Sequence, residues 1–328
     1  MVFSSAAARR CAAFATLLTL MVLPVLAQPG TLSGFPFLRM EPSARAAALG
    51  GAYSAMYGSD VNALFYNPAL LNADMHRSLS VSYLNHLSDL NAGFVSYALH
   101  REGLGTFGGG IRFMSWGEIE RADENGIRDG TFSAGDVALT LGYAGQQSEN
   151  LRYGANVHAV YSGIDSYSAS AVAADVGVAY LVPAQLLTVS ASVNNLGATL
   201  SSFGETTDEL PVDLRLGVTK RLQYLPLLIS VTGYNLHDLG NGPEGGTAAD
   251  NIFSHLAFGG ELQFSDAFQA RIGYNHRRHQ ELKTKSRLDF AGFGLGFGLS
   301  VRRFVLDYGF NSWSSFGRLH QFTVRTSV

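Results

Sequence analysis

The sequence has almost no cysteine, few charged residues and no excess of basic ones. Cys11 is the only cysteine, so the chain beyond it forms no disulfide and holds no thiol nucleophile. Charged residues make up 15% of the chain, well below the usual quarter, and the formal net charge is −3. Because no overall basicity is present, we expect no nucleic-acid partner.

Long apolar runs are also missing beyond Leu26, so the sequence predicts no transmembrane helix. The N-terminal segment is different. Two arginines precede an apolar run from Cys11 to Leu26, and Ala27 completes a small-residue cleavage site. This pattern predicts a secretory signal peptide at residues 1–27. The alternative is an N-terminal membrane anchor, but the run is shorter than the ~20 residues that a spanning helix needs.

Glycine and aromatic residues are plentiful, and apolar and polar residues alternate through most of the chain. Glycine accounts for 37 residues and aromatic residues for 11%. In the segment 151–162, Val157 falls on the apolar face and Asn156 on the polar face, and Ile272 falls on the apolar face of a similar segment. This period of two predicts β-strands. A soluble β-sandwich alternates in the same way, so alternation alone does not decide the fold.

Strand length and loop rhythm favour a membrane barrel. Most of the strands span about 9–13 residues, which a tilted strand needs to cross a bilayer, whereas soluble strands centre on ~5–6. We predict strands near residues 78–87, 91–99, 105–116, 134–146, 151–163, 171–182, 186–196, 212–222, 226–236, 253–264, 268–277, 288–300, 303–311 and 320–327.

Connections after even-numbered strands are tight, and those after odd-numbered strands tend to be long and polar. The long ones are Gly117–Ser133, Gly197–Pro211, His237–Asn251 and Arg278–Arg287. This asymmetry is typical of outer-membrane barrels, whose long loops are extracellular. The predicted fold is all-β: a single-chain transmembrane antiparallel β-barrel of about 14 strands, formed by residues 78–328, with a small N-terminal helical plug. We expect it in the outer membrane of a Gram-negative bacterium, in contact with lipid, with a periplasmic N-terminus.

Residues 28–77 lack the strand pattern and are predicted to form the plug. The segment 42–49 is rich in alanine and ends at Gly50 and Gly51, which form a helix stop. Asn67 and Pro68 look like a helix N-cap and a first helical residue. The segment is too short for a separate domain, so we expect it to fill the lumen; a loosely attached periplasmic arm is the alternative. The structural plug residues are Arg45, Gly50, Gly51, Asn67 and Pro68.

The predicted lumen face carries charges and a row of glycines. The charged residues are Arg152, Asp175, Asp213, Arg215, Glu261, Arg271, Arg303 and Asp307. They could line a permeation path or pair across a packed lumen, and we favour pairing. The glycines are Gly292, Gly294, Gly296 and Gly298. They indicate either close approach by other backbone or curvature of the barrel.

Motifs for chemistry are weak, so we predict no enzyme, no cofactor and no metal. Residues 103–108 match G-x-G-x-x-G, but no helix follows, which argues against a dinucleotide site. His276 and His279 lie in a basic segment without an evident third ligand, which favours a solvated loop over a metal site. A scattered Ser/His/Asp site, such as barrel lipases use, stays open.

Several segments resemble a known family. Ser43–Gly51, followed by Asp60–Leu71 with its Tyr-Asn-Pro-Ala-Leu-Leu element, resembles the N-terminal signature of the PorV/PorQ proteins, which belong to a broader FadL-like group of fourteen-stranded barrels. Gly105–Gly110, Arg121–Gly126 and Phe132–Asp136 are similar to PorQ-like members of that family. These members belong to the type IX secretion system.

The resemblance implies a non-enzymatic component of the type IX secretion and attachment complex. Such a barrel docks a PorZ-like cell-surface protein and joins PorU- and PorV-like proteins. The candidate docking loop holds Glu118, Glu120, Arg121, Asp123 and Glu124, whose polarity suits a protein partner. The alternative is a FadL-like channel for hydrophobic or small solutes. A tightly packed lumen would favour docking, and a continuous apolar tunnel with a lateral opening would favour transport.

Overall fold

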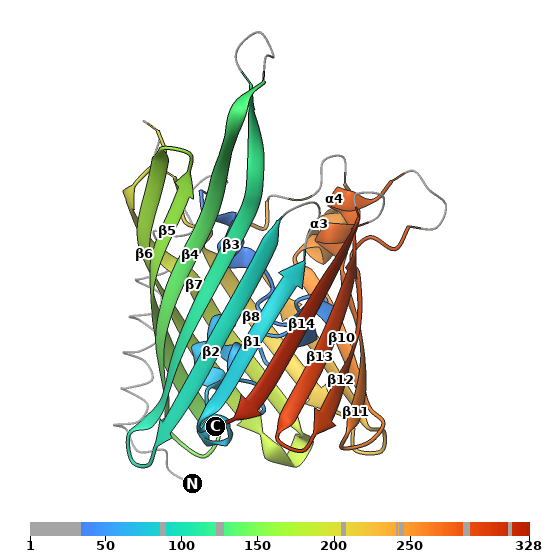
Figure 1. Cartoon of the computed structure of the whole chain (residues 1–328). Helices are drawn as coiled ribbons and strands as arrows, with labels where there is room; N and C mark the ends of the chain where they lie inside the picture. Colours follow the sequence, from blue (N-terminus) through green and yellow to red (C-terminus); the bar gives the residue numbers. More distant parts are fainter. Residues whose placement is uncertain are drawn as a thin grey trace.

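The computed structural model describes residues 34–85, 90–122, 128–204, 208–240, 242, 246–284, 289–313 and 317–328. Within these ranges, fourteen antiparallel strands form a closed barrel (Figure 1). Each strand pairs with its neighbours in the chain, and β1 closes the barrel against β14, where Ser78 pairs with Ser327. The predicted fold class is therefore confirmed. No helix in the described ranges is long and apolar enough to span a membrane.

The wall consists of strands of unequal length, longest on one side. The strands are β1 (Ser78–Asn85), β2 (Asn91–Arg101), β3 (Gly105–Ala122), β4 (Arg128–Gln146), β5 (Leu151–Ile164), β6 (Tyr167–Val182), β7 (Leu187–Ser201), β8 (Asp213–Arg221), β9 (Leu227–Gly233), β10 (Leu256–Gln263), β11 (Phe268–Asn275), β12 (Phe293–Val301), β13 (Phe304–Ser312) and β14 (Arg318–Ser327). The helices are η2 (Pro36–Arg39), α2 (Ala44–Ala48), η3 (Val61–Phe65), η4 (Pro68–Leu70), η5 (Ala73–Met75), η6 (Pro183–Gln185), α3 (Ala248–Ser254) and α4 (His276–Leu282).

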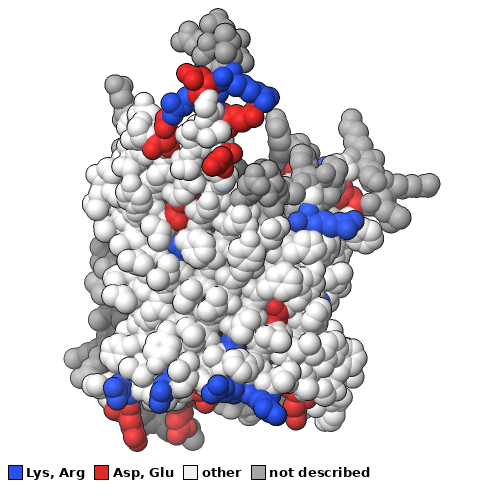
Figure 2. Space-filling model, in the orientation of Figure 1, with Lys and Arg blue, Asp and Glu red and all other residues white. Residues whose placement is uncertain are grey.

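The outer face of the barrel is apolar. Val157 is 60% exposed and Ile272 is 52% exposed, whereas neighbouring Asn156 is 1% exposed and faces the lumen. These assignments agree with the alternation in the sequence. Figure 2 shows most charged side chains gathered at the two ends of the visible face, with a broad band between them in which few charged atoms are visible. Such a large apolar surface is unfavourable in water and matches the lipid-facing band of a membrane barrel.

The two ends of the barrel differ, and we call them the turn end and the loop end. At the turn end, β12 and β13 are joined by Arg302 and Arg303 alone, and the C-terminus lies there (Figure 1). At the loop end, the long connections follow β7, β9 and β11. The connection after β5 is an exception to the predicted rhythm, because Asp165 and Ser166 form a tight turn there.

The predicted loop Gly117–Ser133 is largely a β-hairpin. Strands β3 and β4 continue beyond the rest of the barrel at the top of Figure 1, with Ile119 paired with Phe132 and Glu118 with Ser133. A register shift lies between Ser115 and Glu118. The prediction was wrong because polar composition was taken to mean a loop. An antiparallel ribbon surrounded by water needs no apolar face, so its residues can be polar on both sides.

Two other predicted loops contain helices. Thr247 and Asp250 form a capping box that begins α3 within the loop 237–251. The Asn275 side chain accepts a hydrogen bond from the Arg278 backbone and begins α4, so the basic segment is helical where it was expected to be a solvated loop. Local N-cap side chains stabilise the first turns of these helices. The helices were not predicted because the segments around them are polar and show no helical periodicity.

Residues 34–77 lie inside the barrel as a plug of short helices, drawn in blue in Figure 1. The α2 alanines are buried, and α2 ends at Gly50 and Gly51, whose φ values are +66° and +87°. Asn67 caps η4 by accepting a hydrogen bond from the Ala69 backbone at 3.0 Å. Residues 1–33 lie outside the described ranges, so the signal peptide at 1–27 and the start of the plug segment stay predictions.

Glycines of the wall let the plug backbone approach closely. A Cβ atom added at Gly294 would lie 2.6 Å from the Ala47 carbonyl oxygen, and one at Gly273 would lie 2.1 Å from the Leu49 carbonyl carbon. At Gly154 the added atom would lie 2.5 Å from the carbonyl carbon of Pro68. Of the two interpretations of the glycine row, close approach by other backbone is therefore the one that the structure supports.

Candidate functional site

The plug is fixed to the wall by a buried chain of charges. The Arg45 guanidinium donates from Nε and Nη2 to the two carboxylate oxygens of Glu261, both at 2.8 Å. Arg271 donates to Glu261 at 2.7 Å and to Asp307 at 2.6 Å, and Asp307 also accepts from Arg325 at 3.0 Å. These inward charges therefore pair across a packed lumen, as the sequence analysis favoured.

Asp60 completes the chain from the plug side. Its carboxylate lies 3.8 Å from the guanidinium groups of both Arg45 and Arg325, and the Tyr53 hydroxyl donates to it at 2.5 Å. Burial alone would raise the pKa of Asp60, but Arg325 and Arg45 hold that pKa below its usual value. The plug is thus held by a balanced set of three guanidinium groups and three carboxylates, and each charge has a partner.

One side-chain trio looks like a hydrolytic site but is sealed. Thr140 Oγ1 lies 2.8 Å from His158 Nδ1, and His158 Nε2 lies 2.8 Å from the Asp175 carboxylate. All three residues are at most 3% exposed. The plug covers them, because Asn156 beside this trio donates to the Leu64 carbonyl at 2.8 Å. No substrate can reach the hydroxyl, so this trio ties the wall together and performs no Ser/His/Asp chemistry.

Arg303 was wrongly predicted to face the lumen. It is exposed and lies in the turn between β12 and β13, with its guanidinium 5.3 Å from the centre of the Phe304 ring. In the alternating pattern of the sequence Arg303 occupies an inward-facing position, but β13 begins only at Phe304.

His276 and His279 have no third metal ligand beside them. The described part of the chain has no group of three or more His, Cys, Asp or Glu residues able to hold a metal ion.

Two adjacent chambers lie at the loop end, and the chain segment 36–41 contributes residues to both. The apolar chamber is a cavity of about 410 Å³. Its apolar lining comes from the plug, from β1, β3 and β14, and from the residues beside β2 and β13: Pro36, Phe37, Met40, Ala47, Leu84, Leu90, Met114, Trp116, Trp313 and Leu319. The chamber therefore offers an aromatic and aliphatic surface above the plug.

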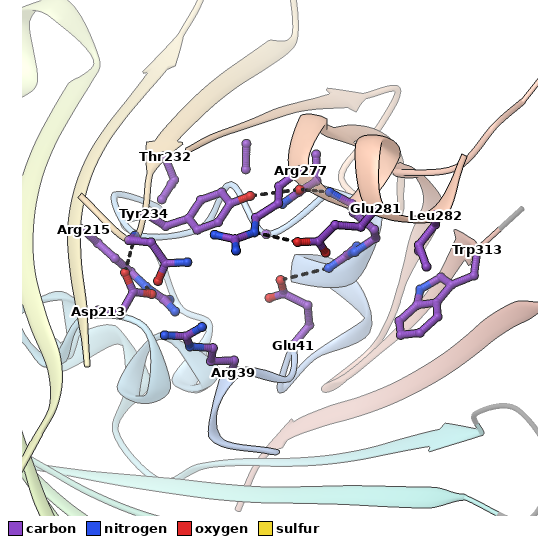
Figure 3. A pocket seen from close by; sticks show the side chains of 15 residues that line it. Arg39, Glu41, Asp213, Arg215, Thr232, Tyr234, Arg277, Glu281, Leu282 and Trp313 are labelled. Atoms are coloured by element: carbon purple, nitrogen blue, oxygen red, sulfur yellow. Dashed lines mark hydrogen bonds and ion pairs between the residues drawn. The ribbon is translucent and has the colours of Figure 1, made fainter. Parts of the chain in front are cut away.

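The polar chamber, shown in Figure 3, has a similar volume of about 410 Å³. Seven charged side chains line it: Arg39, Glu41, Asp213, Arg215, Arg277, Arg278 and Glu281. Tyr234 lies on its wall and donates from its hydroxyl to Asn275 Oδ1 at 3.0 Å. Burial raises the pKa of Tyr234 to about 12, so its hydroxyl stays protonated. Arg39, Glu41, Arg278 and Trp313 line both chambers, which places them on the boundary between the two.

No family model matches the sequence, and a search of curated proteins found no match. Solved structures do match the fold. The Pseudomonas putida toluene transporter TodX aligns with a TM-score of 0.52 and 14% identity, covering 86% of this chain and 96% of TodX. A Pseudomonas aeruginosa FadL homologue aligns at 0.56 and 11%, covering 87% and 98%. The CymD monoaromatic hydrocarbon channel aligns at 0.53 and 12%, covering 88% and 98%.

The fold is that of the FadL-like barrels. At these identities the likeness establishes the architecture, including the closed barrel of fourteen strands. The likeness gives no support for assigning this chain to the PorV/PorQ family or to the type IX system. The sequence motifs are the sole basis for that assignment.

The predicted site residues fall in two separate places. Arg45, Gly50, Gly51, Asn67 and Pro68 lie in the lumen as plug residues. The predicted docking residues Glu118, Glu120 and Arg121 lie on the projecting part of β3; Asp123 and Glu124 lie outside the described ranges.

Two exposed ion pairs link charged side chains of that projecting hairpin to their neighbours. Arg128 donates to Glu120 at 2.9 Å, and Arg121 pairs with Asp165 of the neighbouring turn at 2.6 Å. All four side chains are at least 40% exposed, so each pair contributes little to stability. The hairpin nevertheless presents charged groups well away from the plug.

Neither chamber was predicted from the sequence. Arg39 belongs to no recognisable sequence motif. Trp313 directly follows the last residue of β13 and likewise belongs to no motif. Arg277 and Arg278 were noticed only as part of a basic segment. A tryptophan beside a connection at the loop end was the available signal, but the side chains that complete each chamber come from distant strands.

Proposed function

We propose that this chain is an outer-membrane channel that captures small apolar solutes in the apolar chamber. The observation that carries this proposal is the chamber itself: a cavity of about 410 Å³ at the loop end, ten of whose fifteen lining residues are apolar. Burial of an apolar solute contributes roughly 25 cal/mol per Å². A small hydrocarbon would therefore leave water for this site.

The architecture supports the same proposal. TodX is described as a toluene transporter and CymD as a monoaromatic hydrocarbon channel, and both have this fold. We place the loop end outside the cell and the turn end in the periplasm of a Gram-negative bacterium, because long loops of such barrels are extracellular. In this orientation the apolar chamber faces incoming solutes, and the plug lies between the chamber and the periplasm.

Solute binding is testable through the two tryptophans of the chain, Trp116 and Trp313, which both line the apolar chamber. Toluene titrated into the purified full-length protein should change their fluorescence in a saturable manner. The Met40→Glu variant introduces a charge into the chamber and should weaken binding by at least tenfold. Lys283→Gln, which changes an exposed residue outside the chamber lining, is the matched control. Unsaturable quenching, equal in all three proteins, would contradict the proposal.

A second candidate is docking of a cell-surface protein, which the packed lumen and the projecting β3–β4 hairpin favour. The motifs that resemble PorQ-like proteins suggest a role in type IX attachment, with PorZ-like, PorU-like and PorV-like partners. The strand segments 116–122 and 128–133 extend past the ends of β2 and β5, so their backbone edges are available to a partner strand.

This second candidate predicts loss of partners when the hairpin is shortened. Replacing residues 117–132 by a two-residue turn should leave the barrel intact, as judged by heat-dependent migration on a gel. A tagged, shortened barrel recovered from outer membranes should lack a surface protein that the wild type retains. Identical partners by mass spectrometry would leave transport as the only proposed function.

A further inference from the structure

Three of the four arginines that line the polar chamber pair with carboxylates, and the fourth does not. Arg215 donates to Asp213 at 2.6 Å, and Arg277 donates to Glu281 at 2.7 Å. Arg278 lies 3.8 Å from Glu41. These three pairs use every carboxylate that lines the chamber. Arg39 is the fourth guanidinium of the lining, and the described residues place no carboxylate within 4.0 Å of it.

Arg39 lies in a setting that favours an added negative charge. Its guanidinium makes a hydrogen bond to the Val212 carbonyl at 3.5 Å, the outer limit for such a contact. The Arg39 side chain is exposed, so its guanidinium is open to a ligand from solution. Burial of part of the side chain lowers the pKa of Arg39; Asp213 and Asp238 oppose this shift, while Arg215 and Arg277 add to it. Figure 3 shows the Arg39 side chain directed into the chamber, toward Asp213 and Arg215.

We propose that the polar chamber is a binding site for a small hydrophilic anion, whose single carboxylate or phosphate group pairs with Arg39. A guanidinium presents its donors in a planar fork that fits an oxyanion with two parallel hydrogen bonds. The other three guanidinium groups are held by their own carboxylates, so the chamber has one net positive charge to offer. One bound oxyanion makes the lining neutral.

The remaining lining favours a hydrophilic ligand over a greasy one. Thr232, Tyr234, Asn235 and Asn275 line the chamber alongside the charged groups, and few apolar side chains contribute. The apolar chamber is a neighbouring cavity with a different, mostly apolar lining, although Arg39, Glu41, Arg278 and Trp313 line both. The anion site is therefore a second site, and it does not rest on capture of apolar solutes: either one could exist without the other.

The site is testable with the fluorescence of Trp313, which lines the polar chamber. In a Trp116→Phe background, Trp313 is the one remaining tryptophan of the chain. Acetate and inorganic phosphate should each produce a saturable change at constant ionic strength. Acetamide, which has the shape of acetate without its charge, should produce none.

Two variants change the charge balance in opposite directions. Arg39→Gln removes the spare guanidinium and should weaken acetate binding by at least tenfold. Glu281→Gln releases Arg277 from its partner, so it should strengthen acetate binding several-fold. Arg303→Gln, at the turn end, is the control and should bind acetate as the parent does.

Several results would overturn the proposal. Acetamide could bind as well as acetate, or Arg39→Gln could bind acetate unchanged. A requirement for an alkyl chain, with hexanoate binding but neither acetate nor phosphate, would assign the Arg39 region to an amphipathic ligand instead. If Arg39→Gln does not fold, an unchanged or weaker affinity in Glu281→Gln would by itself reject the anion site.

Discussion

At the scale of single residues, the lumen is organised by pairing of buried charges. The sequence predicted that inward charges pair, and the structure pairs Glu261 with both Arg45 and Arg271. It could not identify the partners, because Arg45 belongs to the plug and lies 216 positions away in the chain. Arg303 was misplaced for a related reason: alternation gives the side of a strand but not where the barrel wall ends.

Removing one member of this buried set should be strongly destabilising. Glu261→Gln would leave Arg45 and Arg271 without their shared countercharge, which costs about 3–5 kcal/mol in comparable buried pairs. Arg128→Gln breaks the exposed pair with Glu120 and should cost at most ~0.5 kcal/mol. Urea unfolding in detergent micelles measures both. A similar, small loss in the two variants would mean that the buried pairs do not hold the plug.

The contribution of Asp60 should depend on pH. Because the folded protein holds the pKa of Asp60 below the usual 3.8, folding stabilises the charged form. That stabilisation is fully present above the usual value and disappears as the pH falls through the lower, folded value. The wild type should therefore lose stability in acid. Asp60→Asn should be less stable at neutral pH and show a flatter acid profile; parallel profiles would assign the acid loss to other groups.

At the scale of elements, local patterns predicted the wall well and the loop end poorly. The predicted strand 151–163 corresponds to β5, Leu151–Ile164. It could be predicted because a membrane-crossing strand alternates apolar side chains that face lipid with side chains that face the lumen. The extended hairpin of β3 and β4 and the helices α3 and α4 were missed. Outside the apolar band no alternation is required, so strand, helix and loop there have similar polar composition.

Contact between the plug and the wall glycines gives a test at this scale. Gly294→Ala would place a methyl group 2.6 Å from the Ala47 carbonyl and push the plug from the wall, at a cost of about 1–3 kcal/mol. Gly109→Ala is the control, because its added methyl would lie 4.0 Å from the nearest side chain, Leu141. Thermal unfolding followed by gel migration should separate the two variants. Equal midpoints would argue against close packing at Gly294.

At the scale of the whole molecule, a barrel of this size needs something inside it. Eight strands are filled by their own side chains, whereas sixteen or more leave a channel. Here fourteen strands enclose a plug whose core residues, among them Tyr53, Leu64 and Leu70, are fully buried. Among the described residues, two adjacent chambers at the loop end provide open volume. The molecule thus combines a closed lumen with binding space at one end.

The closed lumen is the central claim, and steady ion conductance in a planar lipid bilayer tests it most directly. The plug, held by Arg45 through Glu261, should leave the purified wild-type protein with little steady conductance. A variant lacking residues 40–72 should conduct if it inserts as a barrel, because the space that the plug fills would then hold water. Large and stable conductance through the wild-type protein would contradict the account.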